Sequence, residues 1–301
     1  MNIAILSRAE QLYSTQSLLK AGGTLHHDIE VIDPAFCNLM IENNKPIVQY
    51  HDQIIDNLDA VIPRIGASNT YQGASIVRHF ESMGIFSIAS SQGIITSRDK
   101  WTCFQILAAA GIPMPKTTLG PEQYLTSFIK DFGKKPLIIK ILEGTHGQGV
   151  ILCESFKNAL STAETLQAAN VKFVIQEFIE ESQGTDMRAI VIDGEVVAAM
   201  KRQSKEGDFR SNLHRGGSAM SLQLSQEEKE LAIAAAKTVG LHVCGVDILT
   251  SKRGPLVLEI NSTPGLEGIE TTSSVDVSTK IIQCIERNVP VSYIHMTMPR
   301  T

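Results

Sequence analysis

The sequence predicts an N-terminal α/β domain followed by a mixed α+β region. Up to residue 90, apolar runs of strand length alternate with stretches of helical periodicity, the pattern of a parallel sheet flanked by helices. The remainder carries glycine-rich loops and hairpin patterns between helical stretches, which is typical of α+β folds. With 301 residues, the chain is too long for one small core and is expected to form two or three subdomains.

The N-terminal elements follow one another in regular alternation. They are expected, in order, as a strand at 2–6, a helix at 11–21, strands at 29–33 and 59–65, a helix at 71–84 and a strand at 85–89. No G-x-G-x-x-G motif follows the first strand, so a dinucleotide-binding domain would lack its central feature. A helix over 97–110 comes next, and Gly111, Pro113 and Pro115 mark its end.

The second region alternates strands, hairpins and helices. Its expected elements are, in order, strands at 136–142 and 149–154, a helix at 158–169, a strand at 173–179, a hairpin at 187–202, a helix at 225–240, a hairpin at 245–265 and a helix at 274–288. Asp193-Gly194 predicts the turn of the first hairpin. Ser225 and Glu228 have the spacing of a capping box, and Gly240 predicts the end of that helix.

The hairpin at 245–265 carries two carboxylates and a carboxamide. Glu259 and Asn261 share one face of a strand, and a turn centred near Arg253 places Asp247 opposite Glu259. Two carboxylates about 4 Å apart repel by roughly 4 kcal/mol at an effective dielectric near 20. A magnesium ion would offset that repulsion. A solvated face, or pairing of one carboxylate with an arginine, is the alternative; the apolar neighbours favour the metal. Replacing one acid is then expected to preserve or raise stability.

Composition and charge narrow the class of protein. Hydrophobic residues make up 43% and charged residues 20%, an ordinary globular balance, and the net charge of −5 argues against nucleic acid as a partner. No apolar run is long enough for a transmembrane helix, and the N-terminus does not resemble a secretion signal. The five cysteines are scattered, with no CxxC and no histidine at ligand spacing. They are expected to be reduced and buried in a cytoplasmic protein, without a zinc site or a catalytic role.

Two further stretches are suited to anions. The loop "EGTHGQG" at 143–149 has three glycines that let backbone N–H groups approach phosphate oxygens, and Lys140 precedes it, although the pattern is not that of a P-loop. The stretch at 201–217 carries five basic and two acidic residues between Lys201 and Arg215, an excess of positive charge in an acidic chain. Arginines there suit phosphate or carboxylate; a solvated charged loop is the alternative.

The strand "VIQEFI" supplies candidates for a nucleoside. Glu177 and Asp186 could accept hydrogen bonds from ribose hydroxyls, and the backbone near Phe178 could pair with an adenine edge; Asp186 could equally be a cap or pair with Arg188. Taken together, the phosphate-binding stretches and the carboxylate hairpin predict ATP bound through magnesium. A protein kinase is disfavoured because the chain has no H-R-D or D-F-G stretch.

The order of these features resembles the ATP-grasp superfamily. The matching stretches are Lys100, Lys140 with "EGTHGQGV", "VIQEFI", Asp186-Met187-Arg188, "EGDFRSNLHRGG", Asp247 and "LEINSTPGLEGIE". Within the superfamily the chain closely resembles the RimK-type α-L-glutamate ligases, from "MNIAILSR" through "VIPRIG" and "SRDK" to the last helix. His146 departs from the Gln of a family member, and the stretches "HDQIIDNLDA" and "VSYIHMTMPRT" match least.

The resemblance implies an ATP-grasp fold in which two α+β lobes hold ATP and an N-terminal parallel-sheet (pre-ATP-grasp) domain adds to the substrate cleft. The implied division of the chain is an N-terminal domain at 1–95, a central lobe at 96–172, a C-terminal lobe at 173–290 and a tail at 291–301.

The resemblance also implies roles for individual residues. Lys100 and Lys140 would bind ATP phosphates under the loop of Gly147 and Gly149, with Glu177 and Phe178 at the adenosine end. The remaining implied contacts are Asp186 at the ribose, Arg210, Ser211 and Asn212 at the nucleotide, and Asp247, Glu259 and Asn261 around two Mg²⁺ or Mn²⁺ ions.

The implied reaction is ATP-dependent ligation of a carboxylate to an amine through an acyl phosphate. L-Glutamate would be added to the C-terminal glutamate of a small-subunit ribosomal protein, and some family members make free poly-α-glutamate. Arg202 and Arg215 are the candidates for holding substrate carboxylates or the oxyanion, and Arg202 is the first candidate for preferring glutamate over glutamine. The family further implies a cytoplasmic homo-oligomer, a dimer or tetramer, without direct contact to nucleic acid or membrane.

Two other functions stay open from the sequence. One is an ATP-grasp ligase that joins another amino acid or a small carrier molecule. The other is a nucleotide-binding module without ligase activity, which the intact set of Arg210, Asp247, Glu259 and Asn261 disfavours.

Overall fold

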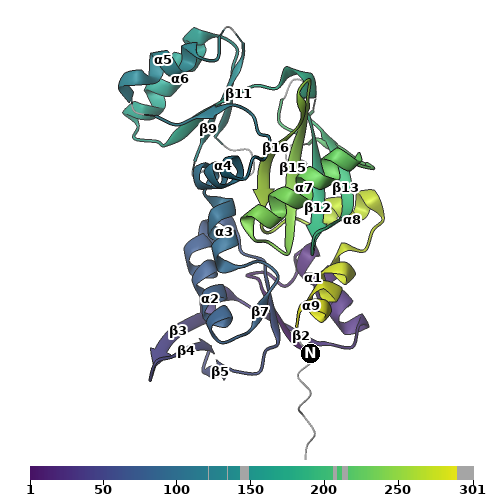
Figure 1. Cartoon of the computed structure of the whole chain (residues 1–301). Coiled ribbons are helices and arrows are strands. Elements are labelled where there is room, and N and C mark those ends of the chain that lie inside the picture. The colour runs from purple at the N-terminus through teal and green to yellow at the C-terminus, as the bar shows by residue number, and fades with distance from the viewer. Residues whose placement is uncertain (121, 134, 143–148, 206–208, 212–215, 290–301) are drawn as a thin grey trace, which may run out of the picture.

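The computed structural model describes residues 1–289 except 121, 134, 143–148, 206–208 and 212–215. The chain folds into three main parts. In Figure 1 the N-terminal domain lies below, a large sheet lies above it and a smaller sheet lies at the upper left. None of the described helices is long and apolar enough to cross a membrane.

The N-terminal domain is a parallel sheet covered on both faces. The strands stand in the order β2-β1-β6-β7, namely β2 (Asp28–Ile32), β1 (Asn2–Leu6), β6 (Ala60–Pro63) and β7 (Phe86–Ser87). Successive residues of β1 face opposite sides: Ala4 packs in the core of helix α2 (Thr70–Ser82), whereas Ile3 packs in the core of α1 (Tyr13–Thr24). This two-sided burial explains why these strands are continuous apolar runs.

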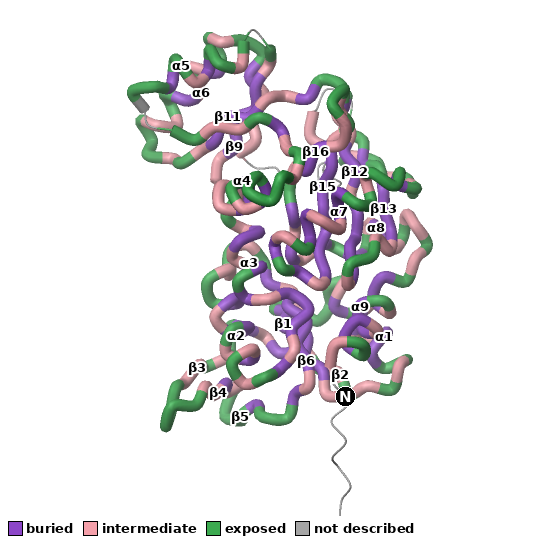
Figure 2. The backbone as a smooth tube through the Cα atoms, viewed as in Figure 1, coloured by how far each residue is buried: buried purple, intermediate pink, exposed green. Residues whose placement is uncertain are grey.

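A small antiparallel sheet interrupts the predicted alternation. It consists of β3 (Cys37–Glu42), β4 (Lys45–Tyr50) and β5 (Gln53–Ile55). Asn43 and Asn44 join the first two strands with positive φ of 49° and 62°, as a type I′ hairpin turn requires. Although its strands contain many apolar residues, only Val48 and Ile55 are buried and much of the sheet is exposed (Figure 2), so it lacks the continuous buried apolar runs of the parallel sheet.

The helix predicted at 97–110 is two helices. Helix α3 (Ser91–Arg98) ends where Asp99 takes an extended conformation, with φ −85° and ψ 97°, and α4 (Lys100–Ala109) begins directly after it. The Asp99 carboxylate accepts a hydrogen bond from the Thr102 N–H at 3.0 Å. The prediction of one helix starting at Ser97 was therefore wrong, because Asp99 acts as an N-cap inside it.

The central sheet is antiparallel and has one covered face. The strands stand in the order β10-β9-β11-β8, namely β10 (Val150–Cys153), β9 (Leu137–Ile141), β11 (Phe173–Glu177) and β8 (Thr117–Thr118). Helices α5 (Leu125–Lys130) and α6 (Phe156–Ala168) pack on one face of it (Figure 1). The predicted lobe boundary at 172/173 falls directly before β11, which pairs with β9 in this sheet.

The C-terminal sheet is larger and also antiparallel. The strands stand in the order β14-β13-β12-β15-β16, namely β14 (Ser218–Ser221), β13 (Glu195–Gln203), β12 (Thr185–Ile192), β15 (Val243–Ser251) and β16 (Gly254–Asn261). Both predicted hairpins are present, and Asp193 and Gly194 turn the first with positive φ of 53° and 80°. Helix α7 (Gln226–Val239) packs on this sheet and has the predicted capping box at Ser225.

The chain returns to the N-terminal domain at its end. Helices α8 (Glu267–Ser273) and α9 (Val277–Asn288) follow β16, and α9 packs beside α1 (Figure 1). Their buried apolar residues share one core with one face of the N-terminal sheet. The C-terminal sheet is therefore attached to the N-terminal domain by packing as well as by the chain.

Candidate functional site

One pocket collects most of the predicted site residues. It lies between the central sheet and the C-terminal sheet and is lined by side chains of both. The predicted residues that line it are Lys100, Lys140, Glu177, Phe178, Asp186, Arg202, Arg210, Ser211, Asp247 and Glu259. Gly147, Asn212 and Arg215 lie outside the described residues. Residues that are far apart in the sequence thus converge on one place.

The floor of the pocket is a buried network of two carboxylates and two arginines. Arg202 donates from Nε and Nη2 to both oxygens of Asp186, each at 2.6 Å, and its Nη2 also reaches Asp247 Oδ2 at 2.9 Å. Arg188 donates from Nε and Nη2 to Asp247, each at 2.7 Å. Strand register explains the network, because Asp186 is opposite Arg202 and Arg188 is opposite Asp247.

The predicted register of Asp247 opposite Glu259 is confirmed. The inference that a metal ion must offset the repulsion between the two carboxylates needs correction. The two residues are register partners, with a β-bulge directly after Asp247. Asp247 is 3% exposed and is neutralised by Arg188 and Arg202, whereas Glu259 is exposed. Burial by itself would raise the pKa of Asp247, but the two guanidinium groups hold it well below its usual range. Pairing with arginine, the alternative reading, therefore already accounts for Asp247 without a metal.

The donor set at this edge nevertheless fits a hard divalent cation. When the Asn261 amide is oriented as its neighbours require, its nitrogen donates to Glu259 Oε1 at 3.2 Å and its oxygen accepts from Arg188 Nη2 at 3.1 Å. Asp247, Glu259 and Asn261 thus offer carboxylate and amide oxygens from two paired strands, and magnesium prefers oxygen ligands of this kind.

Two lysines bring positive charge to the same pocket. Lys140 on β9 is 9% exposed, and burial, followed by the charge of Lys100, lowers its pKa to about 8, while Glu259 and Asp247 oppose that change. Lys100 begins α4 and donates to the Leu142 carbonyl at 3.1 Å; burial lowers its pKa, against the opposing charge of Glu259. Buried cations that face carboxylates across a cavity suit a ligand that carries phosphates and a metal.

The apolar part of the pocket is lined by aromatic and aliphatic side chains. Phe178 and Phe209 meet edge to face with ring centroids 6.4 Å apart, and Arg210 lies over the Phe209 ring at 5.2 Å. Ile138 and Leu249 also line the pocket. Phe209 was not singled out from the sequence, although its place beside Arg210 in the basic stretch could have suggested it. A flat apolar ring can pack against such side chains.

Several predicted contacts are already occupied by the protein itself. Glu177 pairs with Arg253 at the tip of the β15–β16 hairpin. Asp186 also accepts a hydrogen bond from Ser211 Oγ at 2.6 Å, in addition to the two from Arg202. Arg202 is 3% exposed. The prediction that Arg202 binds a substrate carboxylate disagrees with this geometry, because its Nε and Nη2 are committed to Asp186 and Asp247.

Gly149 and Asn261 are not among the residues that line the pocket, although both adjoin it. Gly149 directly precedes the lining residue Val150 and pairs with Ile141 through a backbone hydrogen bond of 2.8 Å. Asn261 lies next to Ile260 and touches the pocket only through Glu259.

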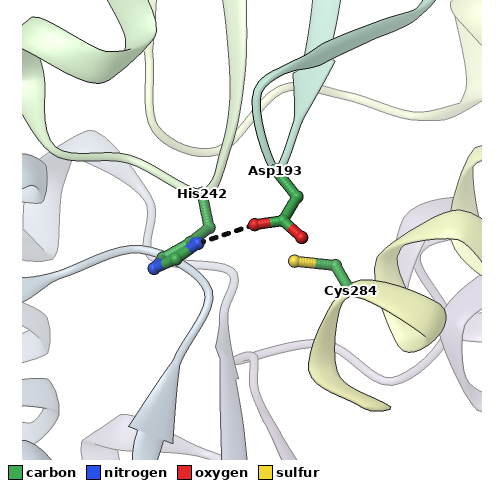
Figure 3. A group of neighbouring side chains, drawn as sticks. All are labelled: Asp193, His242 and Cys284. Atoms are coloured by element: carbon green, nitrogen blue, oxygen red, sulfur yellow. Dashed lines mark hydrogen bonds and ion pairs between the residues drawn. The ribbon is translucent and has the colours of Figure 1, made fainter. Parts of the chain in front are cut away.

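A second cluster of ligand-type side chains lies at the other end of β12. Asp193, His242 and Cys284 bring an oxygen, a nitrogen and a sulfur within 4.8 Å of one another (Figure 3), roughly 23 Å from Asp186 at the rise of a strand. Asp193 Oδ2 also accepts from Arg287 at 3.1 Å and from Asn288 at 3.2 Å.

This cluster is better explained as a structural junction than as a metal centre. Arg287 already neutralises the Asp193 carboxylate, and burial raises the pKa of the Cys284 thiol to about 12. No histidine was expected at ligand spacing from a cysteine, whereas the fold brings His242 and Cys284 together. The cluster joins the first hairpin to α9 and to the segment before β15.

Comparison with known families accounts for nearly the whole chain. A family described as the RimK PreATP-grasp domain matches residues 1–94, and one described as the RimK-like ATP-grasp domain matches residues 97–285. Among curated proteins, a "Probable alpha-L-glutamate ligase 2" of Pseudoalteromonas atlantica is 50% identical over 96% of both chains. A "Probable alpha-L-glutamate ligase" of Vibrio parahaemolyticus has the same identity and coverage.

Solved structures with low identity share the fold. The ATP-grasp ligase PsnB in complex with its minimal precursor is 20% identical, covers 95% of this chain and 99% of its own, and superposes with a TM-score of 0.76. A RimK domain ATP-grasp protein of Sphaerobacter thermophilus is 19% identical, with coverages of 95% and 100% and a TM-score of 0.70.

Proposed function

The chain belongs to the RimK-like ATP-grasp family, and we propose that it is a ligase that uses ATP to add L-glutamate to the carboxylate of a peptide-like acceptor. The fold is the ATP-grasp fold with an N-terminal pre-ATP-grasp domain. Relatives at half identity over nearly the full length are named α-L-glutamate ligases, which supports glutamate as the amine substrate.

One observation on the pocket supports ATP binding independently of the family match. The described pocket is lined by the cations Lys100 and Lys140, by the carboxylates Asp247 and Glu259, and by the apolar rings of Phe178 and Phe209. This is an arrangement for a nucleoside triphosphate, whose base, phosphates and metal need three different surroundings.

The proposed reaction proceeds in two steps. The acceptor carboxylate oxygen attacks the γ-phosphorus of ATP, the bond from that phosphorus to the bridging oxygen breaks, and ADP leaves. The glutamate nitrogen then attacks the acyl carbonyl, the bond from that carbon to the phosphate oxygen breaks, and phosphate and a proton are released. No side chain of the protein forms a bond to substrate.

The chain's own residues position the reactants and balance charge. Lys140 and Lys100 hold the phosphates, as does Arg210, and their charge offsets the negative charge that spreads over the transferring group. Asp247, Glu259 and Asn261 would hold one or two Mg²⁺ or Mn²⁺ ions; bound there, such an ion polarises the phosphoryl oxygens. Arg188 and Arg202 keep Asp247 ionised and fixed in position, and Arg202 does the same for Asp186 next to the ribose.

The identity of the acceptor is proposed from the family resemblance and not from the residues of the pocket. We take the C-terminal glutamate of a small-subunit ribosomal protein as the first candidate, with free poly-α-glutamate as a second product. A dimer or tetramer in the cytoplasm belongs to the same proposal. Ligation of another amino acid, or of a small carrier molecule, is the second candidate function.

Release of ADP tests the proposed function. A ligase forms ADP only when the acceptor peptide and glutamate are both present with ATP and magnesium, and the acceptor gains the mass of one glutamate residue per ADP. A nucleotide-binding module forms no ADP under any of these conditions. Release of ADP with a different amino acid in place of glutamate would favour the second candidate.

A further inference from the structure

Two arginines that the proposed reaction does not use stand at the carboxyl edge of the N-terminal sheet. Arg64 directly follows β6, and its N–H donates to the Leu6 carbonyl at 2.9 Å, so it lies where β1 and β6 end. Arg98 ends α3 and donates from Nη2 to the Ile65 carbonyl at 2.9 Å. The contact brings the two arginines together. Open α/β sheets bind ligands outside this edge of their strands.

Neither guanidinium is neutralised by the described part of the chain. Arg98 Nε is buried and has no hydrogen-bond partner there, and the Arg64 side chain makes no hydrogen bond or ion pair with a described residue. Burial, and then the charge of Arg98, lowers the pKa of Arg64 to about 10, while Glu270 opposes that change. The Glu270 carboxylate is itself bonded to Ser17 Oγ at 2.9 Å and to the Ser278 N–H at 2.8 Å.

Two hydroxyl groups nearby are also left without partners. Ser262 Oγ and Thr263 Oγ1 are buried and have no hydrogen-bond partner among the described residues. They follow β16 directly, and the segment they begin crosses to the start of α1, where the Leu266 N–H donates to Ser14 Oγ at 3.1 Å. That start of α1 lies just beyond the carboxyl end of β1. Buried hydroxyls usually have a hydrogen-bond partner, so these two are available to donate to a bound ligand.

These groups adjoin the reacting end of the pocket. Helix α3, which ends at Arg98, packs against β16, which carries Glu259. Arg98 is therefore close to the strand that carries a candidate metal ligand, and the Glu259 charge acts on both Arg98 and Lys100. A molecule held by both arginines would therefore lie beside the proposed reaction site.

We propose that Arg64 and Arg98, with the hydroxyls of Ser262 and Thr263, bind a carboxylate of a glutamate substrate. The proposal rests on the proposed glutamate ligation and gives it a specificity site. Guanidinium groups match carboxylates with two parallel hydrogen bonds, and the hydroxyls can donate to the same oxygens. The phosphates have their own cations in Lys100, Lys140 and Arg210, whereas Arg202 is occupied by Asp186 and Asp247.

Two substrates could supply that carboxylate: the incoming glutamate and the glutamate at the end of the acceptor. The test uses Arg64→Gln and Arg98→Gln, with Arg78→Gln as a matched control that removes one exposed charge from α2 of the same domain. KM values for L-glutamate, for a peptide ending in glutamate and for ATP are measured by ADP release.

The site variants are expected to raise KM for one of the two glutamate substrates by roughly ten- to a hundredfold, the effect of losing a charge-assisted hydrogen bond. The substrate whose KM rises identifies the source of the carboxylate. KM for ATP should stay within about twofold, and the control should behave as wild type. Unchanged KM values for both glutamate substrates, or an equal rise for ATP, would overturn the proposal.

Stability separates a binding role from a structural one. Arg64 is half-buried and makes no ion pair with a described residue, so Arg64→Gln should melt at the same temperature as wild type or higher, even though it binds substrate less well. A large fall in melting temperature for Arg64→Gln would show that the side chain supports the fold instead.

A binding measurement keeps this proposal apart from the proposed function. Calorimetry with a non-hydrolysable ATP analogue measures binding of L-glutamate and of the peptide without any turnover. Binding by wild type and its loss in Arg98→Gln supports the carboxylate site even if wild type forms no ligated product. Equal binding by wild type and both variants, or no binding by wild type, contradicts it.

Discussion

At the scale of single residues, Asp247 shows how a sequence pattern can be right about position and wrong about cause. Its register with Glu259 followed from the turn and from strand alternation. Its partners did not, because Arg188 and Arg202 come from other strands whose order in the sheet cannot be read from spacing. The repulsion inferred from the sequence is offset by two guanidinium groups in this structure.

The expected effect of Asp247→Asn changes accordingly. From the sequence, loss of one acid should preserve or raise stability. In the structure it leaves Arg188 and Arg202 buried with fewer counter-charges, so the free energy of unfolding should fall by about 3–5 kcal/mol. Glu259→Gln is the control: it removes an exposed acid of the same candidate metal site and should shift stability by less than about 0.5 kcal/mol.

Both variants should lose ligation. ADP release measures that loss, and thermal unfolding of the same samples measures stability. An Asp247→Asn protein as stable as wild type would show that the two arginines do not depend on Asp247.

Lys140 predicts a pH dependence of ATP binding. Burial lowers its pKa from 10.5 to about 8, so the free protein loses this charge as pH rises through about 8. Phosphates favour the charged form, so ATP affinity should fall between pH 7 and 9, with uptake of a proton on binding above pH 8. Calorimetry in two buffers of different ionisation enthalpy measures that proton.

Lys140→Arg is the control, because arginine stays protonated over this range and should make ATP affinity nearly independent of pH. The same shift affects stability with a defined sign. Between about pH 8 and 10.5 the unfolded chain binds more protons at this site, so this group makes stability rise with pH there. Wild-type ATP affinity that is flat from pH 7 to 9 would contradict the assignment.

At the scale of elements, Gly149 illustrates a turn residue that serves the strand as well as the loop. Its φ is +72°, and a Cβ atom there would lie 2.9 Å from Cβ of Ile141 on the paired strand β9. Gly149→Ala should therefore lower the free energy of unfolding by on the order of 1–3 kcal/mol. Gly23→Ala in α1, where a Cβ meets nothing within 4 Å, should be neutral or slightly stabilising.

Chemical unfolding of the two variants measures both effects. Wild-type stability of Gly149→Ala together with weak ATP binding would instead assign this glycine to the phosphate loop alone. The companion expectation, that Gly147→Val weakens ATP binding and leaves stability nearly unchanged, concerns a position outside the described residues and stays a prediction.

Elements with strong local signals were predictable from the sequence. The capping box at Ser225, the Asp193-Gly194 turn and the β15–β16 hairpin are each confirmed. The sheet β3–β5 was missed because most of its residues face solvent, and the break at Asp99 was missed because helical periodicity continues across an N-cap. Local patterns report burial, so elements with little buried surface leave weak patterns.

At the scale of the whole molecule, the sequence assigned the candidate site residues to one ATP-binding site. It could not show which sheet contributes which residue. The central sheet supplies Lys140, and the C-terminal sheet supplies the carboxylates. Arg64, directly after β6, and Arg98, at the end of α3, lie at the carboxyl edge of the N-terminal sheet. The convergence depends on packing between domains, which periodicity within one element does not describe.

Family resemblance reached further than pattern reasoning for the same reason. It identified the ATP-grasp architecture and the ligase activity from the order of motifs along the chain, and the matches over 1–94 and 97–285 confirm it. It gave Arg202 as a substrate contact, whereas the structure makes that residue a partner of Asp186 and Asp247. Geometry, and not motif order, distinguishes a binding arginine from a supporting one.

The central claim is that the acceptor carboxylate is activated by phosphoryl transfer and then joined to glutamate. The most direct test supplies an acceptor peptide whose terminal carboxylate is labelled with oxygen-18, together with ATP, magnesium and L-glutamate. Mass spectrometry of the products should show a peptide longer by one glutamate residue and inorganic phosphate carrying one labelled oxygen per turnover, because the acyl carbon–oxygen bond breaks in the second step. An extended peptide accompanied by unlabelled phosphate would contradict the acyl-phosphate route, and labelled phosphate or ADP without any extended peptide would contradict ligation itself.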